Sequence, residues 1–319
     1  MFRDFRRITT LAIIAAAPAI LIAQTAKWST PTLGYLYDSD SKAIRVLSGI
    51  PGAATLDGGL SVPDKLEQAA ISPNGKYAIA AIKDSGSLSL ITWSADAVTS
   101  ATLDGTPASA DLVAFSNSSA VAAILSRDAQ TIQIWTGLPD QPSLARQVAA
   151  VDLSTLAVSD DGALVAGANT SSVFLIGGDQ PKVIANGGPY ALTFLKDSHD
   201  LAIADQTADQ ISLLTQPDGD MKTQPLAGPA DGVAQVAALA VSGDGAVLVT
   251  ANLRGKSVLT IDLTSKLSTL TQCDCQAEGL YRAQGNAVFR LTNSLGNPIS
   301  VFDGDTGPRV VIIPAGGAQ

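Results

Sequence analysis

The stretch that decides the fold is residues 241–249, VSGDGAVLV, in which a serine and a Gly-Asp-Gly turn precede four apolar residues. Asp-Gly and Asn-Gly pairs supply the positive backbone angles of tight hairpins, so this stretch predicts a hairpin that leads into a strand. The strand has no polar face, and such a strand must be covered on both sides by other parts of the protein.

The same phrase recurs along the chain. Clear copies lie at 71–80 and 158–166, and weaker copies lie at 115–123, 194–203 and 281–289. The residues taken as equivalent are Gly75, Ser119, Gly162, Ser198, Gly245 and Gly285, and their mean spacing is 42 residues. One further step back reaches Gly34, which makes seven copies. A fixed period of this size indicates a repeat architecture.

Each copy continues in the same way. A third strand is predicted at 87–93, 131–135, 173–176, 211–214, 258–262 and 299–303, and a fourth closes each unit, as at 268–271 and 309–313. Four strands in about 42 residues, with burial on both faces, describe a propeller blade. The chain is therefore predicted to be all-β: a seven-bladed β-propeller of four-stranded antiparallel blades, forming one domain over residues 25–319. The first strand of the first copy would fall within residues 25–32.

The amino terminus has the pattern of a secretory signal peptide, assigned to residues 1–24. Arg3, Arg6 and Arg7 precede an apolar run over 11–23, which is too short for an ordinary membrane span. Cleavage could follow Ala19, Ala23 or a site just beyond. The alternative is an uncleaved segment, which would be the only membrane attachment. We expect the protein to be exported to the periplasm or outside the cell.

Composition excludes several classes of protein. With 46% hydrophobic and 15% charged residues, the chain can bury a large core and is not disordered. The net charge is −9, and the 20 lysines and arginines are scattered singly. A nucleic-acid partner is not expected, because binding a phosphate backbone needs a basic stripe.

The chain has two cysteines, Cys273 and Cys275, within QCDCQ at 272–276. Because an exported protein meets oxidising conditions, a small local disulfide that pins a turn is one interpretation. Two free or intermolecular thiols are a second, and a redox-active or metal-binding pair is a third.

Residues 256–266, KSVLTIDLTSK, and the SPNG hairpin at 72–75 carry a resemblance to known proteins. The chain resembles the bacterial β-propellers of the YVTN, NHL and WD40-like kinds over about residues 27–314. It departs from them where Trp93 and Trp135 end third strands, and it has no Gly-His or Trp-Asp dipeptide of a true WD40 set. The two tryptophans either pack between blades or form an exposed aromatic pair for a sugar or peptide.

The resemblance implies where a ligand would bind. In such rings the loops after the second and fourth strands open onto one face, which commonly carries the site. The candidate binding face comprises Lys83, Asp84, Arg127, Asp128, Asn169, Asp205, Arg254, Lys256 and Asp274. The alternative is that these residues form solvated turns. His199, the single histidine, is expected in a surface turn on the opposite face.

No catalytic, cofactor-binding or metal-ligating residues are predicted. There is no Gly-x-Ser-x-Gly elbow and no phosphate loop, and the acidic pairs complete no calcium loop. The sequence favours a non-enzymatic exported propeller that acts as a binding or protein-interaction scaffold in the cell envelope, with a protein, glycan or small ligand on one face. The alternative is a propeller hydrolase or lactonase-type enzyme with a metal at the central channel.

Overall fold

The computed structural model describes residues 30–314, except 63, 96, 151, 179 and 293–297. The compact unit Pro31–Gln319 carries every described strand. The predicted signal peptide, residues 1–24, and its cleavage sites lie outside the described residues.

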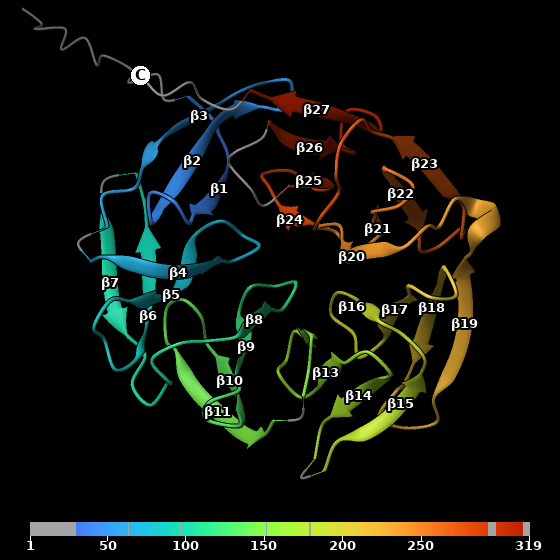
Figure 1. Cartoon of the computed structure of the whole chain (residues 1–319), viewed down its shortest axis with the longest axis horizontal. Helices are drawn as coiled ribbons and strands as arrows, with labels where there is room; N and C mark the ends of the chain where they lie inside the picture. Colours follow the sequence, from blue (N-terminus) through green and yellow to red (C-terminus); the bar gives the residue numbers. More distant parts are fainter. Residues whose placement is uncertain are drawn as a thin grey trace, which may run out of the picture. The chain divides into compact units, whose positions relative to one another are not determined.

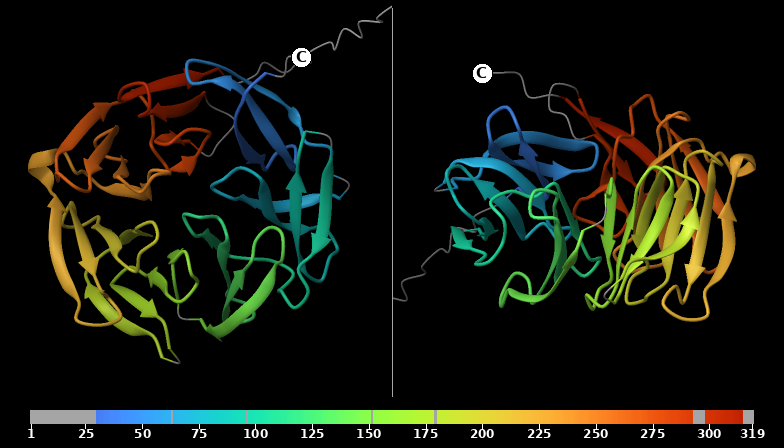
Figure 2. Two further views of the ribbon diagram at one scale, coloured as in Figure 1. Left: turned by 180° about the vertical axis from the view of Figure 1, so that it is seen from behind. Right: turned by 60° about the horizontal axis from the view of Figure 1, so that its bottom comes forward.

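Seven antiparallel sheets follow one another around a central channel (Figure 1), and the two further views in Figure 2 show the same ring. Blade 1 contains β1 (Thr32–Asp38), β2 (Ala43–Ile50) and β3 (Ala53–Gly59); blade 2 contains β4 (Leu66–Ile71), β5 (Tyr77–Ile82), β6 (Leu88–Trp93) and β7 (Val98–Thr102). Blade 3 contains β8 (Leu112–Phe115), β9 (Val121–Ser126), β10 (Thr131–Thr136) and β11 (Ser143–Ala149); blade 4 contains β12 (Thr155–Val158), β13 (Val165–Ala168), β14 (Ser172–Ile176) and β15 (Lys182–Asn186). Blade 5 contains β16 (Tyr190–Phe194), β17 (Leu201–Asp205), β18 (Gln210–Thr215) and β19 (Lys222–Ala227), and the 3₁₀ turn η1 (Pro229–Asp231) follows it. Blade 6 contains β20 (Val236–Val241), β21 (Val247–Asn252), β22 (Ser257–Asp262) and β23 (Ser268–Gln272); blade 7 contains β24 (Tyr281–Arg282), β25 (Val288–Arg290), β26 (Ile299–Asp303) and β27 (Arg309–Ile313).

The prediction of an all-β, seven-bladed propeller is confirmed. Within six blades the strands pair in sequence order, each antiparallel to the next, from the channel outward. Blade 1 differs, because its sheet has three strands among the described residues.

Burial follows the position of each strand in its blade. The second strands are covered on both faces: all six residues of β9 are buried, as are five of the six in β5. The outermost strands β7 and β11 contain no fully buried residue and meet water on one side. This gradient explains why the second strands have no polar face, since neighbouring blades cover both of their sides.

Hydrophobic contacts between blades close the ring. Seven clusters of buried apolar side chains are found, and each joins two neighbouring blades. The cluster that joins the last blade to the first contains Leu33, Leu36, Val288 and Val301. The ring is therefore closed by side-chain packing between the sheets of blade 7 and blade 1.

The recurring serine of the repeat stabilises the hairpin that it begins. In blade 6 the hydroxyl of Ser242 donates to Asp244 Oδ1 at 2.6 Å and accepts from the backbone N–H of Val247 at 2.9 Å. The Ser72 and Ser159 hairpins repeat this arrangement. These bonds satisfy polar groups at the ends of buried strands, which is why the serine recurs with the turn.

The structure corrects the register of the first copy and shows how the two tryptophans pack. Gly34, taken as the hairpin glycine of the first copy, lies inside β1 opposite Leu47, so the register of that copy was wrong. Both Trp93 and Trp135 pack against other side chains of the propeller. Trp135 is buried, and the ring of Trp93 lies 4.8 Å from that of Tyr35.

Candidate functional site

The residues of the predicted binding face lie in connecting loops and at strand ends. Lys83 and Asp84 follow β5, Arg127 and Asp128 follow β9, Asn169 follows β13, Asp205 ends β17, Arg254 and Lys256 follow β21, and Asp274 follows β23. All but Asn169 and Asp205, which are half-buried, are exposed. The structure distributes these residues over several blades and gives some of them partners within the loops.

Two arginines of this set join neighbouring blades. Arg127 Nη1 lies 2.9 Å from Asp111 Oδ1, and its Nη2 donates to the carbonyl of Leu153 at 2.7 Å. Arg254 forms an ion pair with Asp209 of the preceding blade. The carboxylate of Asp205 accepts from two N–H groups of its own turn. These contacts hold loops in place.

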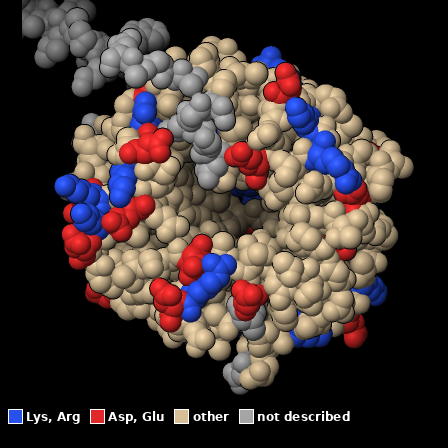
Figure 3. All heavy atoms as spheres, viewed as in Figure 1, with Lys and Arg blue, Asp and Glu red and all other residues tan. Residues whose placement is uncertain are grey.

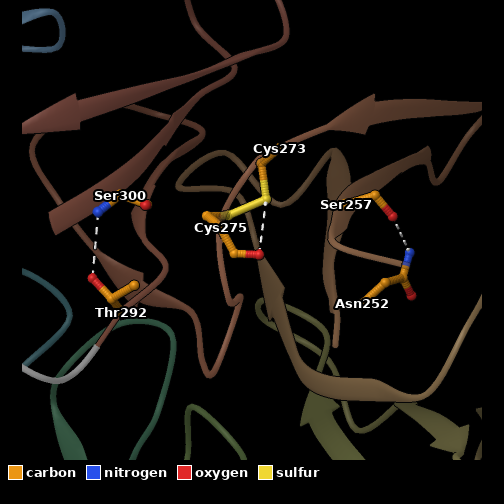
Figure 4. The surroundings of a disulfide bond; sticks show 6 residues. All are labelled: Asn252, Ser257, Cys273, Cys275, Thr292 and Ser300. Carbon is orange, nitrogen blue, oxygen red and sulfur yellow. Dashed lines mark hydrogen bonds between the residues drawn. A yellow bond between two sulfur atoms is a disulfide. The ribbon is translucent and has the colours of Figure 1, made fainter. Parts of the chain in front are cut away.

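A disulfide lies in the loop between blades 6 and 7 (Figure 4). Cys273 and Cys275 are joined by an S–S bond of 2.05 Å, and their Cα atoms are 5.2 Å apart. In Figure 4 the bond lies between two hydrogen-bonded pairs, Asn252 with Ser257 from blade 6 and Thr292 with Ser300 from blade 7. The disulfide therefore fixes the loop where these two blades meet.

The channel contains a small cavity that several blades line. The inner strands of blades 2 to 7 surround a cavity of about 190 Å³, lined by side chains such as Phe115, Leu192 and Arg282. Arg282 reaches across to the carbonyls of Asn117 and Val241. The half-buried guanidinium of Arg282 thus spans the space between three blades.

The channel wall is hollowed beside blade 1. A cavity of about 480 Å³, here called the blade-1 cavity, opens between β1, β4, β8 and β24. Its lining includes Tyr35, Tyr37, Ala70, Asp111, Tyr281, Arg282 and Arg290. Figure 3 shows the mouth of the central channel on this face, with charged side chains of both signs around it. Its size is typical of ligand pockets.

Some polar groups in the blade-1 cavity have no hydrogen-bond partner or no opposite charge among the described residues. The Tyr37 hydroxyl is buried and has no hydrogen-bond partner among the described residues, and burial raises the pKa of Tyr37. Arg290 is 5% exposed, lies over the Tyr281 ring at 4.2 Å and donates to the Thr292 carbonyl. Burial lowers the pKa of Arg290 to about 10. No ion pair among the described residues includes Arg282 or Arg290.

The cavity meets the predicted binding face at its rim. Asp111, which lines the cavity, is the ion-pair partner of Arg127. The sequence analysis placed Arg127 on the binding face but did not identify the tyrosines and arginines beside the channel. One signal in the sequence pointed to an irregular first blade. The expected first strand of the first copy would fall within residues 25–32, directly after the predicted signal peptide.

A second hollow surrounds His199. It measures about 640 Å³ and is lined by Asp160, Asp161, Asp197, Asp200 and Asp218. His199 Nε2 lies 2.9 Å from Asp161 Oδ2, and its Nδ1 lies 3.2 Å from Asp218 Oδ2. Because both ring nitrogens face carboxylates, the doubly protonated ring is the form that satisfies both contacts. The expected surface-turn histidine is in fact a link between three turns.

The contact between His199 and Asp161 shifts their two pKa values in opposite directions. The hydrogen bond to Asp161 raises the pKa of His199 above its usual 6.5, and Asp218 adds to the effect against the opposing cost of burial. Burial opposes ionisation of Asp161, but hydrogen bonds from Ser159, Ala163 and His199 outweigh it and lower the pKa of Asp161 to about 2. The ionised pair is therefore favoured in the folded protein.

We predict that His199→Gln lowers the melting temperature more at about pH 5.5 than at about pH 8.5. A raised histidine pKa contributes stability that is complete below 6.5 and is lost as pH rises through the folded value. Asp161 contributes above its unfolded pKa of 3.8 and loses this contribution as pH falls toward 2. His199 is the only histidine of the chain, so melting curves of both proteins across this pH range isolate it. Equal losses at both pH values would contradict the assignment.

Metal ligands and membrane spans can be checked within the described part of the chain. No group of three His, Cys, Asp or Glu side chains could hold one ion there. Among the same residues, no helix is long and apolar enough to cross a membrane.

Comparison with known proteins identifies the fold alone. No family model matches the chain, and no curated protein matches its sequence. A crystal structure of a functionally unknown protein from Desulfotomaculum acetoxidans DSM 771 is similar, with a TM-score of 0.60 and 13% identity. The match covers 89% of this chain and 99% of that one. The similarity supports the propeller architecture over the whole ring.

Proposed function

We propose that the chain is a non-enzymatic binding module, exported to the periplasm or beyond, that receives its ligand in the blade-1 cavity. The observation that carries this proposal is the hollow of about 480 Å³ beside β1, where the channel wall otherwise encloses about 190 Å³. Ligand sites are typically concave, mostly apolar and equipped with a few polar groups that fix orientation.

The lining of the cavity supports binding. Aromatic rings from Tyr35, Tyr37 and Tyr281 provide large, rigid contact surfaces, and the guanidinium groups of Arg282 and Arg290 provide fixed donors. These side chains come from β1 and blade 7, which are held by the closed ring of seven packed interfaces. A rigid site loses little conformational entropy when a ligand binds.

The predicted face remains part of the proposal. Arg127 and Asp111 connect the loop face to the cavity rim, so a ligand in the cavity could extend over neighbouring loops. The resemblance to YVTN, NHL and WD40-like propellers agrees with this arrangement, since such rings commonly bind partners on one face.

The test is ligand-induced stabilisation of the purified exported protein. Thermal melting would be measured against panels of peptides, oligosaccharides and small metabolites, with Ala70→Trp as the occluding variant and Ala101→Trp on β7 as its control. Ala70 lines the cavity, whereas Ala101 is exposed on the outermost strand of the same blade. Because a ligand at 100 times its Kd stabilises by about 2.7 kcal/mol, a true ligand should raise the melting temperature of the wild type and of Ala101→Trp only.

Two results would overturn this proposal. A ligand that stabilises Ala70→Trp as strongly as the wild type does not bind in the cavity. Turnover of ester or lactone substrates by the wild type, lost in Ala70→Trp, would establish an enzyme and favour the hydrolase alternative.

A further inference from the structure

Among the described residues, blade 1 has no counterpart of the innermost strand of the other blades. β1 and β2 are joined by residues 39–42, which end in Lys42 with φ 52°, as the turn between β17 and β18 ends in Asp209 with φ 50°. β3 contacts β27, the outermost strand of blade 7, as β23 of blade 6 does, so β3 has the outermost position in its sheet and β1 lies two strands further in. β1 is therefore the counterpart of the second strand of the other blades, and the first-strand position has no occupant among the described residues.

The inner edge of β1 is therefore unpaired within the part of the chain that the structure describes. In blades 2 to 7 the second strand pairs with a strand on each side, whereas β1 pairs with β2 alone among the described residues. An unpaired strand edge presents a row of backbone N–H and C=O groups, which can pair with an added strand.

The blade-1 cavity occupies the place of this strand. Its walls come from β1, from the inner strands on either side, β4 of blade 2 and β24 of blade 7, and from β8 of blade 3. β4 and β24 are the neighbours that a first strand of blade 1 would have in a complete ring (Figure 1). The cavity therefore has the position, the open edge and the two flanking strands that a bound strand needs.

The chemistry of the walls specifies the kind of strand. Arg290 is a buried cation that forms no ion pair among the described residues, and Arg282 is a second cation in the same cavity. Asp111, the acid on the rim, is already paired with Arg127. Buried charges are usually paired, so the described walls of the cavity lack a carboxylate for Arg290. The buried hydroxyl of Tyr37 also lacks a partner among the described residues.

We infer that the blade-1 cavity binds an extended acidic peptide, which adds to the inner edge of β1 and places a carboxylate against Arg290. The inference rests on the proposed function, because it names the ligand class of the same cavity. Backbone hydrogen bonds to β1 would supply affinity, and Arg290 and Tyr37 would select the side chains. The rival occupant is the chain's own segment over residues 21–26. Residues 27–31 separate it from β1, as residues 72–76 separate β4 from β5.

The test uses three labelled peptides of roughly six residues, the usual length of a strand. One alternates valine with glutamate, one alternates valine with lysine, and one is the glutamate peptide with alternate amides N-methylated. Fluorescence anisotropy with the exported protein should show binding of the glutamate peptide. We expect the lysine peptide to bind at least about tenfold more weakly, because like charges would meet in the cavity. Each N-methyl group on a bonding amide should weaken binding about fivefold.

A matched pair of variants separates binding from folding. Tyr37→Phe removes a hydroxyl that has no partner among the described residues, so it should leave the melting temperature unchanged and weaken peptide binding about fivefold. Tyr77→Phe removes a hydroxyl that donates to the Ser119 carbonyl at 2.7 Å, away from the cavity lining. It should lower the melting temperature and leave peptide affinity unchanged.

The outcomes distinguish this inference from the proposed function. Equal binding of the methylated and parent peptides would exclude strand addition, and the proposed function would stand if Ala70→Trp still abolished binding. Absence of any ligand for the cavity would overturn both. The amino terminus of the exported protein, read by mass spectrometry, decides the rival. The rival predicts two results. Mass spectrometry should find residues 21–26 in the exported protein, and the peptide should bind only to a shortened variant that begins at Thr25. If both results are found, the chain itself occupies the position and the inference is wrong.

Discussion

Replacing Phe302 by alanine is expected to lower the free energy of unfolding by about 3–5 kcal/mol. Phe302 lies in β26, is 0% exposed and stands opposite Phe289 in the adjoining strand. Its ring packs with Val249 and Ala251 of blade 6, so truncation opens a void at the interface between the last two blades. The interior is packed at the density of an organic crystal, and its atoms relax only in part around a missing ring. Urea denaturation measured by tryptophan fluorescence would give the change.

The control for this substitution lies in the same blade. Ile312 in β27 is 57% exposed, and Ile312→Ala should change the free energy of unfolding by less than about 0.5 kcal/mol. Similar losses for the two variants would show that packing between blades 6 and 7 does not limit stability, contrary to the role given to the interface.

The architecture could be predicted because its determinants are local. A serine, a turn glycine and an apolar strand recur together, as in residues 241–249, and each copy forms the same hairpin. The apolar faces of β5 and β9 indicated cover on both sides before any neighbour was known. The ring follows from repeating this unit, because each blade buries its faces only against the next.

The cavity could not be predicted in this way, because its residues come from distant parts of the chain. Tyr37 and Arg290 line one hollow from blades 1 and 7, which meet only when the ring closes. The alignment on Gly34 put a hairpin where β1 runs, and the first strand of this copy was expected within residues 25–32, at the edge of the leader. A single insertion or deletion relative to the period is enough to cause such an error.

The His199 contact shows the same limit of sequence patterns. Asp161 lies 38 residues before His199, and Asp218 lies 19 residues after it. The hairpin pattern identified Asp161 and His199 as turn residues, since Asp and Gly favour turns. The pattern carries no information on which turns of neighbouring blades approach each other, and that approach determines the pKa of His199.

The hairpin glycines provide the second large effect. Gly285→Ala is expected to lower the free energy of unfolding by about 2–5 kcal/mol. Gly285 has φ +133°, and an added Cβ would lie 2.5 Å from Val288 Cγ2 and 2.6 Å from Asp305 Oδ2. Asp305 cannot move away freely, because its carboxylate accepts from the N–H groups of Asn286 and Ala287. The substitution therefore strains the backbone and disrupts the cap of the same turn.

Two further glycines separate these causes. Gly307 has φ +120° with nothing within 4 Å of an added Cβ, so Gly307→Ala should cost only the backbone strain, about 1–3 kcal/mol. Gly86 has neither a positive φ nor a close neighbour, and Gly86→Ala should be close to neutral. The three variants should rank in this order in urea denaturation. If Gly307→Ala were as damaging as Gly285→Ala, backbone strain alone would explain the loss, and the contact with Asp305 would contribute nothing to the preference for glycine at the hairpin.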